Sequence, residues 1–193
     1  MDSLLRQVRN CRECAGRLPH EPRPVVRASR TCRIVLIGQA PGTRVHNTGI
    51  PWNDPSGDLL RVWMGLDRET FYDESRIALV PMGFCYPGKG RSGDLPPRPE
   101  CAPLWHERIF EQMPAVRLTV LIGQYAQRHY LGGRAGKPLA DTVKDFATHL
   151  PRYLPLPHPS PRNRLWLRRN AWFDETVVPC FRKLVTEILN VPV

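Results

Sequence analysis

The alternation of short apolar runs with helical segments constrains the fold of this chain more than any other feature. Each run is rich in Ile, Val and Leu and ends near a turn residue, as buried strands do. Four strands are expected, over residues 31–38, 77–84, 117–123 and 153–156. Helices are expected near the N-terminus, from Ser56 or Asp58 onward, over 124–131 and over 172–189.

Strands that alternate with helices predict a parallel sheet with helices on both faces. The expected fold class is therefore α/β, as a three-layer α/β/α sandwich with a central four-stranded parallel sheet. The chain has 193 residues, of which 41% are hydrophobic, and this suits one packed core. Because neither a repeat nor a low-complexity linker divides the sequence, a single domain over residues 1–193 is expected.

Turn-rich loops follow the expected strands. Parallel sheets of this kind bind ligands beyond the carboxyl ends of their strands. The loops over 39–54 and 81–85, the segment at Gln124 and the loop that holds His158 should therefore meet at one edge of the sheet. This convergence predicts a single active site there.

The loop after the last expected strand reads LPLPHPSPRN (154–163) and holds His158 among four prolines. Each proline fixes its own φ and biases the preceding residue toward extended backbone. Such a stiff loop has few conformations to lose when it becomes ordered. On this stretch alone, a surface turn and a functional loop explain the sequence equally well.

The charge of the chain favours a polyanionic partner. Lys and Arg number 28 against 18 Asp and Glu, which gives a net charge of +10. Contacts from such residues to phosphates release counterions. The segment RNRLWLRRN (162–170) also mixes basic residues with Leu165 and Trp166, which suits a surface that grips a DNA backbone and enters a base stack. An amphipathic surface helix explains this segment equally well.

The sequence has no feature of a membrane or secreted protein. No stretch approaches the roughly 18 to 20 apolar residues that a bilayer span needs. The N-terminal segment MDSLLRQVRN lacks the apolar core of a secretory signal. We therefore expect a cytoplasmic protein without a membrane partner, and we expect it to be a monomer.

Four of the six cysteines have a spacing that suits a metal site. Cys11 and Cys14 form a C-x-x-C pair, and Cys85 and Cys101 bracket a long Pro- and Gly-rich segment. A long irregular segment needs something to tie it down, and thiolates at its two ends would do so. Four thiolates suit zinc or an iron–sulfur cluster, and the spacing does not choose between them. The other two cysteines, Cys32 and Cys180, are expected to pack as small hydrophobic residues.

Together these motifs resemble the uracil-DNA glycosylase superfamily, specifically its iron–sulfur branch, families 4 and 5. The resemblance spans nearly the whole chain and rests on the order of the motifs: C-x-x-C, GQAPG (38–42), TGIPWNDPSGDLL (48–60), the segment between Cys85 and Cys101, LTVLIG, and HPSPRN. It implies that the four cysteines hold a [4Fe–4S] cluster, with zinc as the alternative. It also implies a DNA-repair enzyme that extrudes uracil, or another deaminated base, and hydrolyses its N-glycosidic bond.

The resemblance assigns the HPSPRN loop to leaving-group stabilisation and DNA contact. His158 matches the histidine that donates a hydrogen bond to the base as negative charge develops on its O2. Ser160 would contact a phosphate, with Asn163 close by. Arg162, Leu165 or Trp166 would fill the gap that the extruded nucleotide leaves.

The first motif implies a base pocket lined by the backbone of Gly38, Gln39, Ala40 and Gly42. Family 4 has Glu where this chain has Gln39, and family 1 has Asp where this chain has Ala40, so this motif lacks a carboxylate. Asp54 instead fits the position of the catalytic aspartate of family 5, where it would position water or stabilise the sugar cation. A plain helix cap is the alternative role for Asp54.

Two further positions bear on the choice of base. Trp52 matches the aromatic residue that stacks on the extruded base. Pro81 stands where family 4 has an Asn that reads the uracil edge, and proline has neither a side-chain donor nor an amide hydrogen. Selectivity would then come from backbone groups near Met82 or from Asn53, and relaxed specificity is expected. Two rival functions remain open, a non-catalytic nucleic-acid-binding member of the same fold and a zinc-stabilised protein that acts on a free nucleotide.

Overall fold

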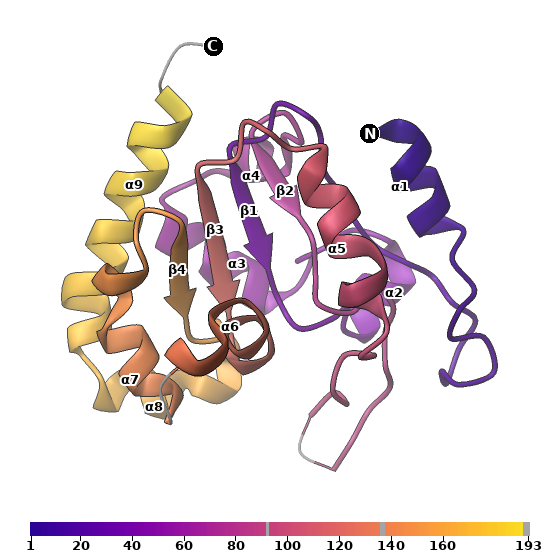
Figure 1. Cartoon of the computed structure of the whole chain (residues 1–193). Coiled ribbons are helices and arrows are strands. Elements are labelled where there is room, and N and C mark those ends of the chain that lie inside the picture. The colour runs from indigo at the N-terminus through magenta and orange to yellow at the C-terminus, as the bar shows by residue number, and fades with distance from the viewer. Residues whose placement is uncertain (92, 136–137, 191–193) are drawn as a thin grey trace.

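Four parallel strands form the centre of the computed structural model, which describes residues 1–91, 93–135 and 138–190. They are β1 (Ile34–Ile37), β2 (Ile77–Leu79), β3 (Leu118–Ile122) and β4 (Tyr153–Leu156), in the order β2-β1-β3-β4 (Figure 1). Every strand residue except Tyr153 is buried. The predicted four-stranded parallel sheet is confirmed.

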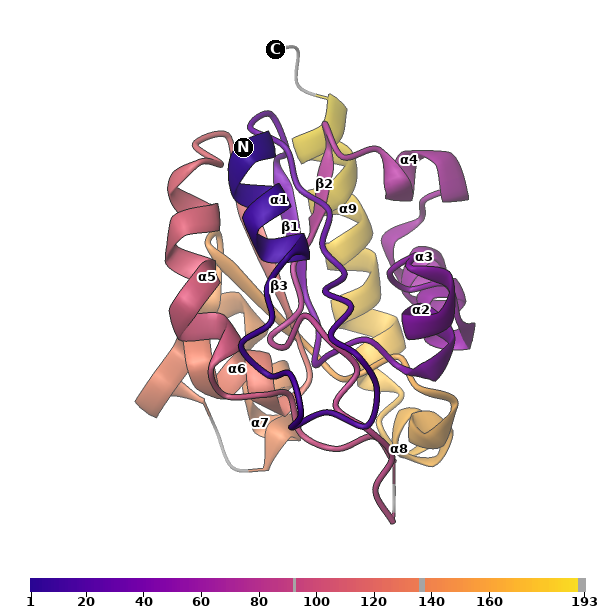
Figure 2. The same ribbon diagram turned by 90° about the vertical axis from the view of Figure 1, so that its right-hand side faces the viewer.

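Helices cover both faces of the sheet, because alternate residues of each buried strand point to opposite sides. In β1, Ile34 and Leu36 belong to one apolar core, and Val35 and Ile37 belong to the other. Figure 2 shows α5 and α9 on opposite sides of the sheet. The described helices are α1 (Asp2–Arg9), α2 (Thr43–Thr48), α3 (Pro55–Met64), α4 (Arg68–Tyr72), α5 (Cys101–Glu111), α6 (Gln124–Leu131), α7 (Leu139–Lys144), α8 (Arg164–Arg169) and α9 (Val178–Asn190).

The two cores define the layers. One core joins the sheet to α3, α4 and α9 through residues such as Trp63, Phe71 and Phe181. The other joins it to α1, α5 and α6 through residues such as Leu5 and Ile109. The structure is thus the predicted three-layer α/β/α sandwich.

Several element boundaries differ from those expected. The strand expected over 77–84 ends at Leu79, because Pro81 has no N–H to continue the ladder. The last helix, α9, begins at Val178 and follows one π-helical turn over Phe173–Val177. The helices α2, α4, α5 and α7 were not expected. The single domain predicted over 1–193 includes residues 92, 136–137 and 191–193, which lie outside the described residues.

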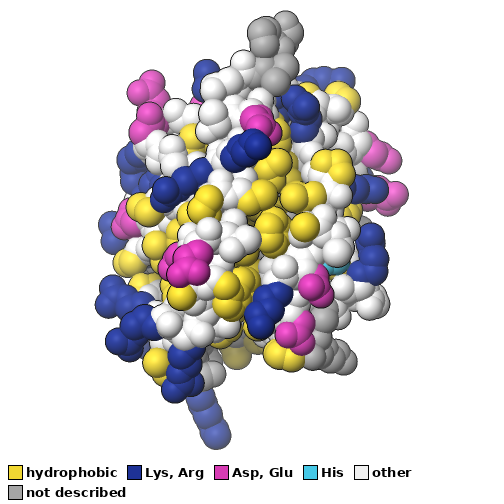
Figure 3. All heavy atoms as spheres, turned by 90° about the vertical axis from the view of Figure 1, so that its left-hand side faces the viewer, with side chains coloured by type: hydrophobic (Ala, Val, Ile, Leu, Met, Phe, Trp, Pro, Cys, Tyr) yellow, Lys and Arg dark blue, Asp and Glu magenta, His cyan; other side chains and the backbone are white. Residues whose placement is uncertain are grey.

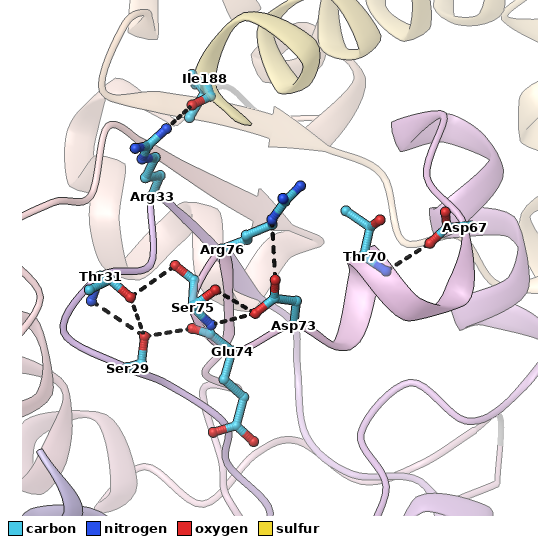
Figure 4. A network of polar contacts seen from close by, with 10 residues as sticks. All are labelled: Ser29, Thr31, Arg33, Asp67, Thr70, Asp73, Glu74, Ser75, Arg76 and Ile188. Carbon is cyan, nitrogen blue, oxygen red and sulfur yellow. Dashed lines mark hydrogen bonds and ion pairs between the residues drawn. The ribbon is translucent and has the colours of Figure 1, made fainter. Parts of the chain in front are cut away.

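Hydrogen bonds and an ion pair connect the segments at the amino ends of β1 and β2 (Figure 4). This end of the sheet lies opposite the carboxyl edge, where the site is expected. Ser29 Oγ donates to the Glu74 carbonyl at 2.7 Å, and Thr31 Oγ1 donates to the Ser75 carbonyl at 3.1 Å. Arg33 reaches across to the Ile188 carbonyl of α9 at 3.1 Å. These bonds join the amino ends of the two strands to each other and to α9, at the end of the sheet opposite the hollow described below.

Basic side chains are spread around the α9 side of the molecule, so the net charge of +10 is not confined to one loop (Figure 3). Across residues 1–91, 93–135 and 138–190, no helix has both the length and the apolar character needed to cross a membrane.

Candidate active site

A hollow of about 50 Å³ opens at the carboxyl ends of β1, β2 and β4. Three of the loops expected to converge contribute to its wall, those that follow β1, β2 and β4. The predicted site residues that line it are Gly38, Gln39, Ala40, Gly42, Trp52, Asp54, Pro81 and His158. The segment at Gln124 lines a neighbouring hollow instead, which also includes Gln39 and His158 in its wall.

Two residues predicted for the pocket do not line it. Asn53 turns its amide oxygen to Arg68, whose Nη2 donates to it at 3.3 Å. Met82 is buried in the core beneath α1 and α5. Its backbone still serves the site, because Met82 N–H donates to the Gly38 carbonyl at 2.9 Å. Neither side chain lines the hollow, and the selectivity expected from Asn53 or from backbone groups near Met82 stays a prediction.

The GQAPG turn is held on both sides by hydrogen bonds. The Gln39 carbonyl accepts from Gly83 N–H at 2.9 Å, and Gln39 Nε2 donates to the Leu95 carbonyl at 2.9 Å. Gly38 packs directly under Trp52, since a Cβ on Gly38 would lie 2.7 Å from Trp52 Cζ2. The turn thus presents its backbone to the hollow in one fixed path.

The Pro81 carbonyl is held by a buried histidine, His106, which no sequence motif indicates. His106 Nδ1 lies 2.5 Å from Tyr130 Oη, and His106 Nε2 lies 3.0 Å from the Pro81 carbonyl. Burial lowers the pKa of His106 to about 4, so the ring is neutral. A neutral ring has one N–H, which Nε2 donates to the Pro81 carbonyl while Nδ1 accepts from the tyrosine hydroxyl.

Asp54 both caps a helix and lines the hollow. It is the N-cap of α3, where its Oδ1 accepts from Gly57 N–H at 2.9 Å. Pro55 follows at the first helical position, which its fixed φ suits. A carboxylate has two oxygens with several lone pairs, so the cap bond leaves acceptor capacity for a second partner. The two roles considered for Asp54 are therefore compatible.

Trp52 forms a wall of the hollow from a rare backbone conformation. Its φ is 57°, in the left-handed region that bulky residues seldom adopt. The indole stacks against the His158 ring, with centroids 5.7 Å apart and planes at 28°. Residues held in such conformations cluster at ligand sites when the surrounding structure fixes them.

Gly57 is part of what fixes Trp52. A Cβ at position 57 would lie 1.8 Å from the Trp52 carbonyl oxygen, so alanine cannot fit without movement of the turn. We expect Gly57→Ala to destabilise the protein by about 1–3 kcal/mol, as overpacking does. Gly133→Ala is the matched control, because a Cβ there meets nothing within 4 Å. Equal unfolding midpoints for the two variants in thermal denaturation would contradict this account of the turn.

His158 is held by the loop that carries it. Asn163 Nδ2 donates to the His158 carbonyl at 2.7 Å, so this amide shapes the loop. Burial lowers the pKa of the His158 ring, and the nearby Asp54 carboxylate opposes that shift. The ring is therefore neutral at pH 7 and has one N–H to donate.

The remaining residues predicted to bind DNA differ in their contacts and exposure. Ser160 Oγ accepts from Arg162 N–H at 3.2 Å and caps the short turn over Pro161–Asn163. Leu165 on α8 is 50% exposed, and its expected role as a wedge stays a prediction. Trp166 instead packs edge-on against Trp172 and Phe173, with ring centroids 5.9 and 6.0 Å away. Trp166 is half-buried by these contacts, and its expected role in the DNA gap stays a prediction.

The four cysteines of the expected metal site line one small hollow of about 20 Å³. Burial raises the pKa of Cys85 to about 12 and that of Cys101 to about 11, and the neighbouring cysteines add to both shifts. Within the described ranges, no group of three or more His, Cys, Asp or Glu side chains is placed to hold a metal ion. Cys32 is fully buried with its sulfur 3.4 Å from that of Met113, and Cys180 packs against the other core.

The fold is that of an α/β protein with a hollow at the carboxyl edge of a parallel sheet. The family model described as the uracil DNA glycosylase superfamily matches residues 26–182, and the chain belongs to this superfamily. A solution NMR structure of a provisionally assigned uracil DNA glycosylase from Methanosarcina acetivorans is 18% identical, with a TM-score of 0.43. That likeness covers 81% of this chain and 93% of the other.

Proposed function

We propose that this protein is a monofunctional DNA glycosylase that excises uracil, and other deaminated bases, from DNA. The observation that carries the proposal is the shared hollow of Asp54 and His158, which has Trp52 as a third wall. Family membership supports it. A base inside a duplex is out of reach, so the nucleotide must leave the stack before this hollow can receive it.

His158 would stabilise the leaving group. When the bond between C1′ and the base nitrogen breaks, its electron pair goes to the base, and negative charge develops on the base oxygen atoms. A neutral ring fixed by its loop can donate a hydrogen bond to that charge without reorganising. The lowered pKa of His158 supports a hydrogen-bond donor here, because the neutral ring retains one N–H at pH 7.

Asp54 would stabilise the positive charge that develops on the sugar. The transition state has oxocarbenium character, and a nearby carboxylate stabilises such a cation and orients the attacking water. The oxygen of that water forms the new bond to C1′. Because the cap bond to Gly57 fixes the carboxylate, its position is set before the substrate binds.

The pocket has few groups that read the base edge. Pro81 offers no donor, and Gln39 Nε2 is engaged by the Leu95 carbonyl. Backbone groups of the GQAPG turn are then the principal readers, and relaxed specificity among deaminated bases is expected. Ser160, Arg162 and Leu165 would contact the DNA backbone and the vacated stack.

The four cysteines suit a [4Fe–4S] cluster as donors, since all four line one hollow. Such a cluster would cross-link the N-terminal segment to both ends of the segment between Cys85 and Cys101. Binding would deprotonate the thiols, and the raised pKa values of Cys85 and Cys101 keep these two protonated otherwise. Zinc at the same cysteines is the alternative.

Cys101→Ser is expected to abolish the brown colour and the iron content of the purified protein and to lower its unfolding temperature. Cys180→Ser is the control, because Cys180 is remote from that hollow and should keep both. Iron analysis and visible absorbance are the measurements. A colourless wild-type protein that contains stoichiometric zinc would replace the cluster with the zinc alternative.

The function is tested with oligonucleotides that carry uracil, hypoxanthine or xanthine, followed by alkaline cleavage of abasic sites. Strand breakage at the modified position, with uracil among the substrates, is the expected result. Tight binding to these oligonucleotides without any breakage would favour the non-catalytic DNA-binding role instead.

A further inference from the structure

The segment between Cys85 and Cys101 turns back on itself beside the active site. Leu95 N–H donates to the Gly88 carbonyl at 2.8 Å, and Gly90 N–H donates to the Gly93 carbonyl at 2.6 Å. Lys89 and Asp94 form an antiparallel bridge between these bonds. We call the described residues 88–91 and 93–95 the hairpin arms.

The hairpin arms contact two motif loops of the site. Leu95 accepts the hydrogen bond from Gln39 in the turn after β1. Gly93 packs against Arg162 of the His158 loop, since a Cβ on Gly93 would lie 2.8 Å from Arg162 Nη1. These contacts fix the position of Asp94, the residue between them.

The Asp94 carboxylate lies beside Gly42, at the wall of the hollow. Its Oδ2 is 3.3 Å from the place where a Cβ on Gly42 would be, and Gly42 lines the hollow. Asp94 itself does not line the hollow and remains open to solvent. An extruded base that fills this hollow leaves its sugar outside with the DNA backbone, and Asp94 is a solvent-exposed carboxylate beside the Gly42 wall.

We propose that Asp94 is the second carboxylate of the site, the group that accepts the proton of the attacking water. This inference rests on the proposed glycosylase function and completes its proton balance. As the water oxygen bonds to C1′, the C1′–N bond breaks and its electron pair goes to the base. The water proton passes to the Asp94 carboxylate, which later returns it to solvent.

The surroundings of the two carboxylates assign charge stabilisation to Asp54 and proton acceptance to Asp94. Asp54 already accepts the cap bond of α3 and serves best as fixed negative charge beside the sugar cation. Three charged groups act on Asp94: Asp54 raises its pKa, and Arg162 and Lys89 lower it. Partial loss of hydration of this carboxylate, which still reaches solvent, is the largest influence and raises the pKa of Asp94, so it holds a proton more readily than an ordinary aspartate.

The test measures single-turnover base release from a uracil oligonucleotide as a function of pH. Asp94→Asn is expected to lower the rate by about 10²-fold, in the range for loss of a general base, with little change in the affinity for an uncleavable analogue. Lys89→Met should move the acidic limb of the wild-type rate to higher pH, because loss of that cation raises the pKa of Asp94. In the Asp94→Asn background, Lys89→Met should leave the limb where it is.

The outcomes separate the two proposals. A wild-type protein that releases base, with an Asp94→Asn rate within about threefold of it, overturns the role of Asp94 and keeps the glycosylase function. If Lys89→Met shifts the limb equally in both backgrounds, a purely structural role for Asp94 is left and the inference fails. A wild-type protein that releases no base overturns both proposals.

Discussion

Asp54→Asn is expected to lower the single-turnover rate of base release by about 10²- to 10³-fold, the range for loss of one fixed electrostatic partner of the transition state. The variant should fold as the wild type does, because Asn caps helices about as well as Asp. The cap bond to Gly57 can therefore persist while the negative charge beside the sugar is lost. Single-turnover kinetics and thermal denaturation together measure the two effects.

Asp67→Asn is the matched control for this experiment. Asp67 caps α4 in the same way, with its Oδ1 accepting from Thr70 N–H at 2.7 Å, and it does not line the hollow. Its substitution should leave base release at the wild-type rate. If Asp54→Asn also leaves base release unchanged, Asp54 is only a helix cap and the proposed mechanism is wrong.

His158→Ala is expected to lower the rate of base release by about 10²- to 10³-fold, as the loss of one fixed donor to a developing anion does. His158→Gln keeps an N–H donor and should recover part of that loss. Because the pKa of the His158 ring is held below its ordinary value, the ring stays neutral between pH 7 and 8. Over this interval the contribution of the ring to the wild-type rate should be constant.

The control for His158 is His129→Ala. His129 packs edge-on against Tyr130 and lines a groove that shares no residue with the active-site hollow. Its substitution should not change the rate. Equal activity of His158→Ala and His129→Ala would remove His158 from the mechanism.

The sheet could be predicted because its strands are buried on both faces and their apolar runs are unambiguous. The end of β2 and the start of α5 could not be predicted from the sequence, and each has its own reason. Pro81 ends the ladder inside an apolar run, and α5 starts at Cys101 with a proline in its first turn, which the loop-like composition before it conceals.

The candidate site was predictable where function follows a strand end. Asp54, Trp52 and His158 lie in turn-rich segments after β1 and β4, and the topology brings such segments together. Leu95 and Asp94 could not be predicted as site residues, because the hairpin arms reach the site only through tertiary contacts. Gln39 and Leu95 are 56 positions apart, and no local pattern signals their hydrogen bond. The hydrogen bond of Asn163 to the His158 carbonyl and the contact of Trp166 with Trp172 became evident only in three dimensions.

The central claim is tested most directly by mass spectrometry of one uracil-containing oligonucleotide after incubation with the wild-type protein. The glycosylase function predicts free uracil and an intact strand whose mass corresponds to an abasic site, with neither product formed by Asp54→Asn in the same time. Recovery of the unchanged oligonucleotide with the wild-type protein, at concentrations where it is fully bound, would contradict it.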